Sequence, residues 1–259
     1  MPPCILTIAG SDSSCGAGAQ ADIKTIAALG GYGLNALTSV VSEAPGLVSQ
    51  IRLLDAEIIA DQMRVLFGAF PIQAAKTGML GGVEQTRAVV RALRPGLPLV
   101  VDPVMVATGG GRLMNEDAVS IVTNELFPLA ALITPNMDEA QVLVKRAVMT
   151  RSDLLGCAEE LAARFGCAVL VKGGHLTGDA ADVLWHGGKA EWFESPRIAG
   201  VRTHGTGCSL SAAIATGLGK GLPLAAAVRE AKIFVHRAIT HHHDWAGVHA
   251  LNHLHQPPP

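Results

Sequence analysis

The stretch Gly205-Thr206-Gly207-Cys208 has residue types and a spacing that suit phosphoryl transfer. Its two glycines let the backbone approach a ligand without a Cβ, and the small residues that follow predict a helix. The free amides and the dipole of a helix N-terminus favour a bound anion, and they stabilise a thiolate over a thiol. We therefore expect Gly205, Thr206 and Gly207 to hold a phosphoryl group and Cys208 to accept a proton near neutral pH. The alternative is a Gly-rich turn before a packed alanine helix, with Cys208 as a small buried apolar residue.

Polar residues follow the carboxyl ends of several predicted strands. They are Asp102, Asn136, Glu139, Lys172 and the loop after Gly10. Open α/β sheets bind their ligands at that edge, so these residues are expected to share one site. The glycines at 10, 16 and 18 do not form G-x-G-x-x-G, and no G-x-x-x-x-G-K-[ST] occurs, so neither a dinucleotide fingerprint nor a Walker loop is indicated.

The elements that position this site are read from buried strands alternating with amphipathic helices. Strands are expected at 4–9, 35–42, 74–77, 99–101, 131–134 and 168–171, followed by a hairpin of 182–185 and 190–193. Helices are expected from 19, at 55–67 capped by Asp55, at 83–93, at 116–125, from about 137, at 152–165 capped by Ser152, at 210–218 and at 224–241. This alternation predicts an α/β fold: a single-domain, doubly wound, mostly parallel sheet with helices on both faces.

The composition restricts the class of protein. The 259 residues are 49% hydrophobic and 16% charged, which suits one large core and argues against disorder. A net charge of −2 and 4% aromatic residues provide no surface for nucleic acid, and no apolar run reaches membrane-spanning length. The five cysteines include no C-x-x-C pair and indicate free thiols in a reducing compartment. We expect a cytoplasmic protein with neither nucleic-acid nor membrane partners.

Residues 241–259 form a tail rich in histidine and proline, which we separate from a domain at 1–240. A nickel- or zinc-binding tail is conceivable, but we expect a solvated, partly frayed terminus.

Six motifs together carry a resemblance to a known family. They are A-G-S-D at 9–12 with G-A-G-x-Q-A-D at 16–22, K-T-G-M-L at 76–80, D-P-V-M-V-A at 102–107, T-P-N-x-x-E-A at 134–140, V-K-G-G-H at 171–175 and T-H-G-T-G-C at 203–208. Over about residues 5–238 the chain resembles the ribokinase superfamily, and within it the hydroxymethylpyrimidine/phosphomethylpyrimidine kinases of thiamine biosynthesis. The resemblance implies a ribokinase-like fold, ATP and Mg²⁺ as cofactors, a hydroxymethylpyrimidine substrate and a homodimer.

The resemblance also implies roles for individual residues. Cys208 would be the base, with Gly205, Thr206 and Gly207 as the anion hole. Asp102 and Glu139 would help to place magnesium, and Asn136, Lys172 and Lys232 would contact the nucleotide. The wall of the pyrimidine pocket would be formed by Gly10, Ala17, Asp22, Met79 and Val106. From the residues alone, Asp22 could equally be a first-turn helix carboxylate.

Position 43 departs from the family pattern, which usually presents a glutamine there to the pyrimidine ring nitrogen and amino group. Glu43 retains an acceptor but loses the amide donor. A shared proton, on the carboxylate or on the ring nitrogen, would restore both hydrogen bonds. Glu43 could instead mark a changed substrate. The alternatives to a pyrimidine kinase are a pyridoxal/pyridoxine kinase and a non-catalytic pyrimidine-binding sensor; the retained transfer residues argue against the sensor.

Overall fold

The computed structural model describes residues 1–105, 114–174, 176, 178–201 and 204–255. Its strands are β1 (Cys4–Ala9), β2 (Tyr32–Leu37), β3 (Ser39–Ala44), β4 (Leu47–Leu53), β5 (Ile72–Thr77), β6 (Leu99–Val101), β7 (Leu132–Ile133), β8 (Ala168–Val171), β9 (Ala180–His186), β10 (Lys189–Ser195), β11 (His243–Trp245) and β12 (Val248–Ala250). Its α-helices are α1 (Gly18–Ala28), α2 (Ala56–Ala69), α3 (Val83–Ala92), α4 (Glu116–Ile121), α5 (Met137–Val144), α6 (Arg151–Phe165), α7 (Thr206–Gly219) and α8 (Leu224–Thr240).

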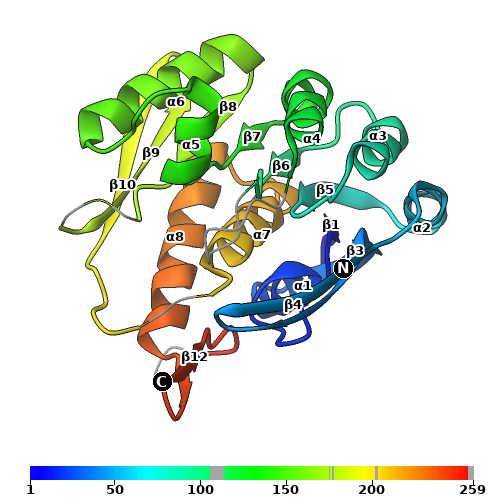
Figure 1. Ribbon diagram of the computed structural model, residues 1–259, viewed down its shortest axis with the longest axis horizontal. Helices are drawn as coiled ribbons and strands as arrows, with labels where there is room; N and C mark the ends of the chain where they lie inside the picture. The colour runs from blue at the N-terminus through cyan, green and yellow to red at the C-terminus, as the bar shows by residue number, and fades with distance from the viewer. Residues whose placement is uncertain (106–113, 175, 177, 202–203, 256–259) are drawn as a thin grey trace.

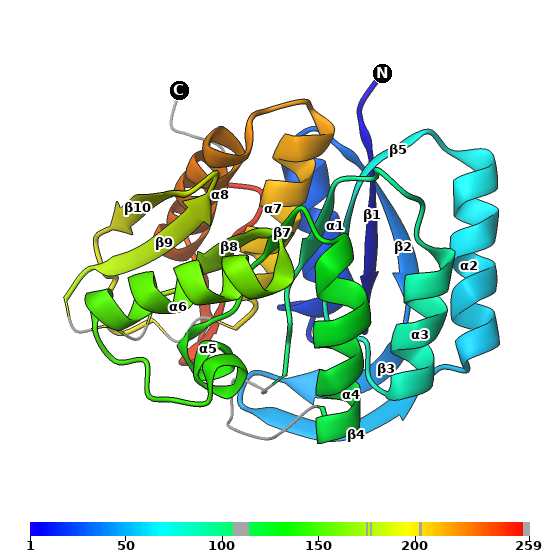
Figure 2. The same ribbon diagram turned by 90° about the horizontal axis from the view of Figure 1, so that it is seen from above.

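The central sheet has eight strands in the order β10-β9-β8-β7-β6-β5-β1-β2. The pairs from β2 to β8 are parallel, whereas β9 and β10 form an antiparallel edge. Helices cover both faces of the sheet, as Figures 1 and 2 show. The predicted doubly wound, mostly parallel α/β fold is confirmed.

Alternation along the strands divides the core into two layers, because successive side chains of a strand point to opposite faces. Leu6 and Val101 belong to the larger layer, which includes side chains from α2 to α6. Ile5 and Val100 belong to the second layer, which includes side chains of α1, α7 and α8. The small residues of α7 suit this position, since alanines allow the helix to lie close to both the sheet and α8.

Three of the predicted elements differ in the structure. The single strand expected at 35–42 is two strands, β2 and β3, and β3 leaves the main sheet to form a hairpin with β4. The N-cap of α6 is Thr150 and not Ser152, because the Thr150 side chain accepts from the Asp153 amide in a capping box. Asp55 occupies the N-cap position of α2 but makes no capping hydrogen bond with its side chain.

The C-terminal segment is more ordered than expected for a solvated terminus. Strands β11 and β12 form a small hairpin, and Leu251 and His253 are buried. The Oγ of Ser209 in α7 lies 2.9 Å from Nε2 of His253. The expectation of a frayed tail is therefore wrong for residues 243–253, because burial of these two side chains attaches the segment to the helix that carries Cys208.

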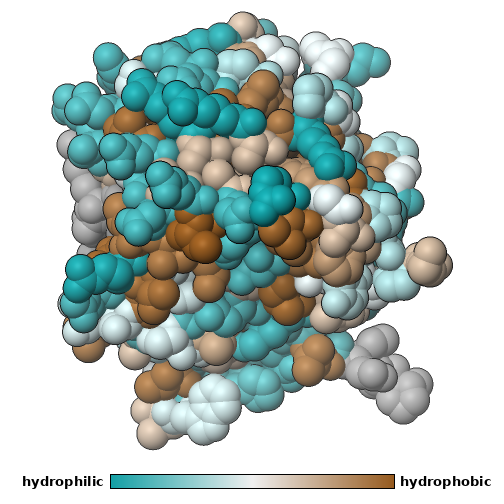
Figure 3. Space-filling view, turned by 90° about the vertical axis from the view of Figure 1, so that its right-hand side faces the viewer, coloured by the Kyte–Doolittle hydropathy of each residue, from teal (hydrophilic) through white to brown (hydrophobic). Residues whose placement is uncertain are grey.

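The surface over α2 and α3 is mixed in polarity. Figure 3 shows hydrophobic residues there in separate groups among hydrophilic ones. Among the described residues, no helix combines the length and apolar character that crossing a membrane requires.

Candidate active site

A cavity of about 600 Å³ lies at the carboxyl edge of the parallel strands. It brings together most of the predicted site residues: Gly10, Ala17, Glu43, Met79, Asp102, Asn136, Glu139, Lys172, Gly205, Thr206, Gly207, Cys208 and Lys232. Val106 lies outside the described residues. Asp22 does not line the cavity, and its assignment to the pocket wall is corrected below.

The N-terminus of α7 opens into this cavity and is shaped by two glycines. Gly205 is the N-cap residue with φ of +82°, a left-handed conformation that favours glycine. Gly207 has no such constraint, but a Cβ there would lie 3.1 Å from Nζ of Lys172 and 3.5 Å from Oδ2 of Asp102. The first turn of α7 therefore presents its amides next to a lysine, in a space that a side chain would restrict.

Cys208 lies in the first turn of α7, and its protonation state differs from the prediction. Burial raises the pKa of the Cys208 thiol to about 11, although the positive charge of Lys76 opposes this shift. Desolvation is the largest cause of this shift and favours the thiol, which is opposite to the thiolate predicted near neutral pH.

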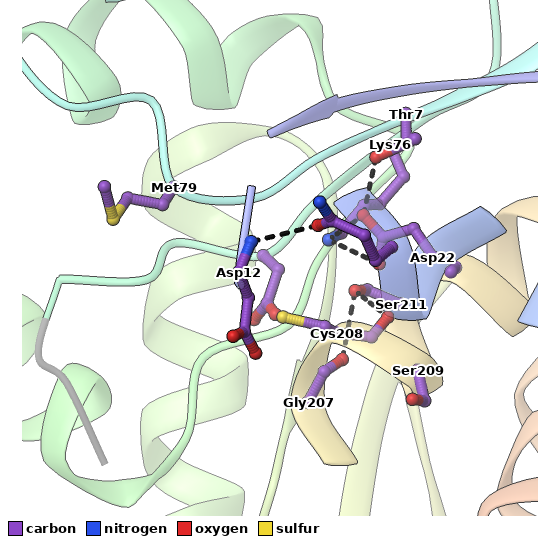
Figure 4. A network of polar contacts seen from close by, with 12 residues as sticks. Thr7, Asp12, Asp22, Lys76, Met79, Gly207, Cys208, Ser209 and Ser211 are labelled. Atoms are coloured by element: carbon purple, nitrogen blue, oxygen red, sulfur yellow. Dashed lines mark hydrogen bonds and ion pairs between the residues drawn. The ribbon is translucent and has the colours of Figure 1, made fainter. Parts of the chain in front are cut away.

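Beside Cys208, a buried ion pair contains the residue that was misassigned from the sequence. Nζ of Lys76 lies 2.8 Å and 3.0 Å from the two carboxylate oxygens of Asp22, and both side chains are fully buried. The Thr7 hydroxyl donates to Asp22 over 2.5 Å (Figure 4). Asp22 is thus the counter-ion of Lys76 and is no part of the pocket wall. Burial alone would lower the pKa of Lys76, yet the negative charge of Asp22 raises it, so Lys76 remains a cation.

A second ion pair lies beside Gly207 at the α7 N-terminus. Nζ of Lys172 is 2.8 Å from Oδ1 of Asp102, which also accepts from Thr134 over 3.3 Å. Burial would lower the pKa of Lys172, but Asp102 and then Glu139 raise it. This arrangement holds a positive charge and carboxylate oxygens beside the amides of α7.

Glu139 is held by backbone amides. Its Oε1 accepts from Met105 over 3.2 Å and its Oε2 accepts from Asn136 over 2.9 Å, while the Asn136 side chain caps α5 in return. Burial raises the pKa of Glu139 to about 7, against the charge of Lys172. Asp102 and Glu139 supply the oxygen donors that Mg²⁺ prefers, so the residues fit that ion. The two backbone hydrogen bonds hold the Glu139 carboxyl in place, and each oxygen retains a lone pair that could face the ion or one of its waters.

Lys232 reaches the cavity from α8. Its Nζ lies 2.5 Å from Oδ2 of Asp182 in β9, and Oδ1 of Asp182 accepts from the Gly173 amide over 2.9 Å. The ion pair with Asp182 positions this cation beside β9, and Lys172 and Lys232, which both line the cavity, are called its cationic wall below.

The loop after β1 supplies a further group of ionisable residues. Asp12 accepts from the amides of Ser14, Gly16 and Ala17, and Nε2 of His204 lies 3.0 Å from its Oδ2. The same His204 nitrogen lies 3.3 Å from Oε1 of Glu43. One imidazole thus faces two carboxylates.

Four functional residues were not assigned roles from the sequence: Asp12, Lys76, Asp182 and His204. Lys76 had a detectable signal, since it is the only charged residue in β5. Asp12 and His204 lie within the quoted motifs but 192 residues apart, so their contact depends on the fold. Asp182 lies within β9 and carries no local signal of its partner on α8.

Comparison with known proteins identifies similar chains. A family model described as phosphomethylpyrimidine kinase matches residues 12–253. A hydroxymethylpyrimidine/phosphomethylpyrimidine kinase of Rhizobium meliloti is 44% identical over 91% of this chain and 90% of its own length. A protein of the same name from Streptomyces coelicolor is 42% identical over 92% and 89%.

Two solved structures of kinases are also similar to this chain. A phosphomethylpyrimidine kinase from Clostridium difficile is 35% identical, with a TM-score of 0.81 over 92% of this chain and 99% of that one. A Bacillus subtilis pyridoxal kinase, crystallised as an ADP complex, is 34% identical, with a TM-score of 0.89 over 98% of both chains.

Proposed function

Because the chain belongs to the phosphomethylpyrimidine kinase family, we propose that it transfers the γ-phosphoryl group of ATP to the hydroxymethyl group of 4-amino-5-hydroxymethyl-2-methylpyrimidine. The monophosphate would be the second substrate and would be converted to the diphosphate, in thiamine biosynthesis. The observation that carries the proposal is one cavity in which the α7 N-terminus, Cys208 and three lysines converge, namely Lys76, Lys172 and Lys232. Phosphoryl transfer depends mainly on positioning and charge neutralisation, which this set of groups can provide.

The transfer step assigns a role to each part of α7. The substrate oxygen attacks the γ-phosphorus, the bond from that phosphorus to the bridging oxygen of ADP breaks, and the hydroxyl proton passes to Sγ of Cys208. The amides of Gly205, Thr206 and Gly207 would stabilise the charge on the transferring group. Since the resting thiol must first lose its own proton, the thiolate population would limit the rate.

The nucleotide phosphates would be held by the cationic wall of the cavity. Lys172 and Lys232 offer ammonium donors, and Asn136 lies at the N-terminus of α5 beside them. Mg²⁺, placed through Asp102 and Glu139, would supply charge neutralisation of the phosphates.

Assembly and location complete the proposal. A homodimer is supported by the exposed apolar side chains of the β3–β4 hairpin, which a second copy would cover. They are Val40, Leu47, Val48, Ile51 and Leu53.

We place the protein in the cytoplasm because its cysteines are free among the described residues. Residues 1–240 would form the kinase domain and 241–259 an appended segment.

A pyridoxal kinase activity is the second candidate, favoured by the structural similarity to the Bacillus subtilis pyridoxal kinase. ADP formation is to be measured with hydroxymethylpyrimidine, its monophosphate, pyridoxal and pyridoxine, with each product identified by mass. We expect phosphorylated pyrimidine with wild type and loss of this product with Cys208→Ala. Phosphorylation of pyridoxal without turnover of the pyrimidine would reject the substrate assignment but retain the kinase reaction.

A further inference from the structure

The Asp12–His204–Glu43 cluster places two carboxyl groups around a single imidazole nitrogen. The ligand atoms of the three residues all lie within 4.8 Å of one another. The side chains of Asp12, His204 and Glu43 are 2%, 14% and 17% exposed, so water screens their charges only weakly. All three line the cavity, on the side that also contains Val41, Val48 and Ile51.

The His204 imidazole interacts more closely with Asp12 than with Glu43. His204 is 3.0 Å from Asp12 and 3.3 Å from Glu43, and Asp12 also accepts the three loop amides. Burial would raise the pKa of Asp12, but hydrogen bonds, first from His204, lower it to about 2. The hydrogen bond to Asp12 likewise raises the pKa of His204. Asp12 and His204 therefore form a neutral ion pair, and the charge of Glu43 remains uncompensated.

The backbone fixes where Glu43 points. A register shift between Ser42 and Glu43 interrupts the pairing of β3 with β4, and such a bulge re-aims the side chain. The Ser13 hydroxyl accepts from the Glu43 amide over 2.7 Å and donates to its carbonyl over 2.6 Å. The backbone of Glu43 is thus attached to the same loop that holds Asp12, which places the Glu43 side chain beside that loop.

We propose that His204 is a positioning residue that keeps Glu43 available as an anion, so that the site selects an aminopyrimidine protonated on its ring nitrogen. This inference rests on the proposed function and, of the two locations for the shared proton at position 43, chooses the ring nitrogen. A protonated ring nitrogen beside an amine presents two donors, which match a carboxylate, and its charge balances the cluster. A neutral ring would direct its lone pair at Glu43. Burial and the charge of Asp12 raise the pKa of Glu43, which indicates that this anion needs a cationic partner.

The test is the number of protons taken up when hydroxymethylpyrimidine binds in the absence of ATP. It is measured by calorimetry at about pH 7.5 in buffers of different ionisation enthalpy. Wild type is expected to take up about one proton per ligand, and its affinity to fall about tenfold per pH unit as pH rises. The ultraviolet spectrum of the bound ligand reports whether its ring carries the proton, which we expect. Proton uptake with a neutral-ring spectrum would place the proton on Glu43 and overturn the inference.

Two variants separate positioning from simple structural support. Glu43→Gln should bind the neutral ring with almost no proton uptake and a flat pH dependence. His204→Gln keeps an N–H donor but removes the charge, so Glu43 should already be protonated before binding, and proton uptake should fall below about half of the wild-type value. His186→Gln, at the exposed end of β9, is the control.

Weaker binding of His204→Gln with unchanged proton uptake would overturn the positioning role. Failure of the proposed function looks different, because turnover of the pyrimidine would then be absent in wild type. A protein that phosphorylates the pyrimidine but binds it without proton uptake would retain the function and exclude this inference.

Discussion

The backbone of Gly205 lies against the carbonyl oxygen of Gly16, so closely that a Cβ at position 205 would overlap that oxygen. This contact joins the loop after β1 to the N-terminus of α7, and so brings Asp12 next to His204. It also places the proposed substrate side of the cavity next to the proposed phosphoryl site. The loop after β1 and the N-terminus of α7 can therefore pack together only if residue 205 has no side chain.

Gly205→Ala should therefore both destabilise the protein and reduce turnover. The left-handed backbone and the overlap together are expected to cost about 3 kcal/mol or more. Gly221 is the matched control, because it has the same φ of +82° and a Cβ at that position would meet none of the described atoms within 4 Å. Gly221→Ala should cost about 1 kcal/mol, with turnover unchanged. Urea denaturation measures the free energy of unfolding, and steady-state kinetics measure turnover. An equal loss of unfolding free energy in the two variants would show that the contact with Gly16 is unimportant.

The rate of transfer should rise with pH. With a Cys208 pKa of about 11, the thiolate fraction increases about tenfold per pH unit between about pH 7 and pH 9. Single-turnover measurements should show this slope in wild type and a shallower profile in Cys208→Asp, because a carboxyl group loses its proton at lower pH than a thiol in the same place.

Cys208→Ala should lower turnover about 10²–10⁴-fold, whereas Cys167→Ser, away from the cavity, should leave it unchanged. A wild-type profile without slope would exclude rate-limiting ionisation of the thiol.

Removing one partner of the Lys76–Asp22 pair should be far more costly than removing both. Lys76→Met leaves a buried carboxylate uncompensated and is expected to cost about 3–5 kcal/mol. Adding Asp22→Asn should recover much of this stability. Turnover should remain low in the double variant, because the charge that favours the Cys208 thiolate is still absent.

Arg64→Ala provides the comparison for this pair. It breaks the exposed pair with Asp61 and should cost less than about 1 kcal/mol. Full recovery of turnover in the double variant would show that Lys76 has no electrostatic role.

The buried His253 should make the protein less stable in mild acid. Burial lowers the pKa of His253 from 6.5 to about 4, so between these values the unfolded chain binds a proton that the folded protein does not. Stability is therefore fully present above about pH 6.5 and should fall by up to about 3 kcal/mol towards pH 4. Denaturation at several pH values should show a shallower loss for His253→Gln, while His186→Gln retains the wild-type profile. Parallel profiles for wild type and His253→Gln would contradict this role.

The sequence by itself determined the layered fold and most of the site. Hydrophobic residues repeat with different periods in strands and helices, so the local pattern predicts the elements. The carboxyl ends of parallel strands meet at one edge of the sheet. These two rules place Asp102, Asn136, Glu139 and Lys172 together at the cavity. The departure at Glu43 was also visible without a structure.

Tertiary structure decided the protonation and the partners of these groups. The family resemblance assigned Asp22 to the pocket wall, and nothing local reveals that Lys76, 54 residues away, lies beside it. The helix position of Cys208 predicts a thiolate, but desolvation of the thiol raises the pKa of Cys208 instead. Desolvation and ion pairing depend on every group packed around a side chain, and those groups come from distant segments that only the folded chain brings together.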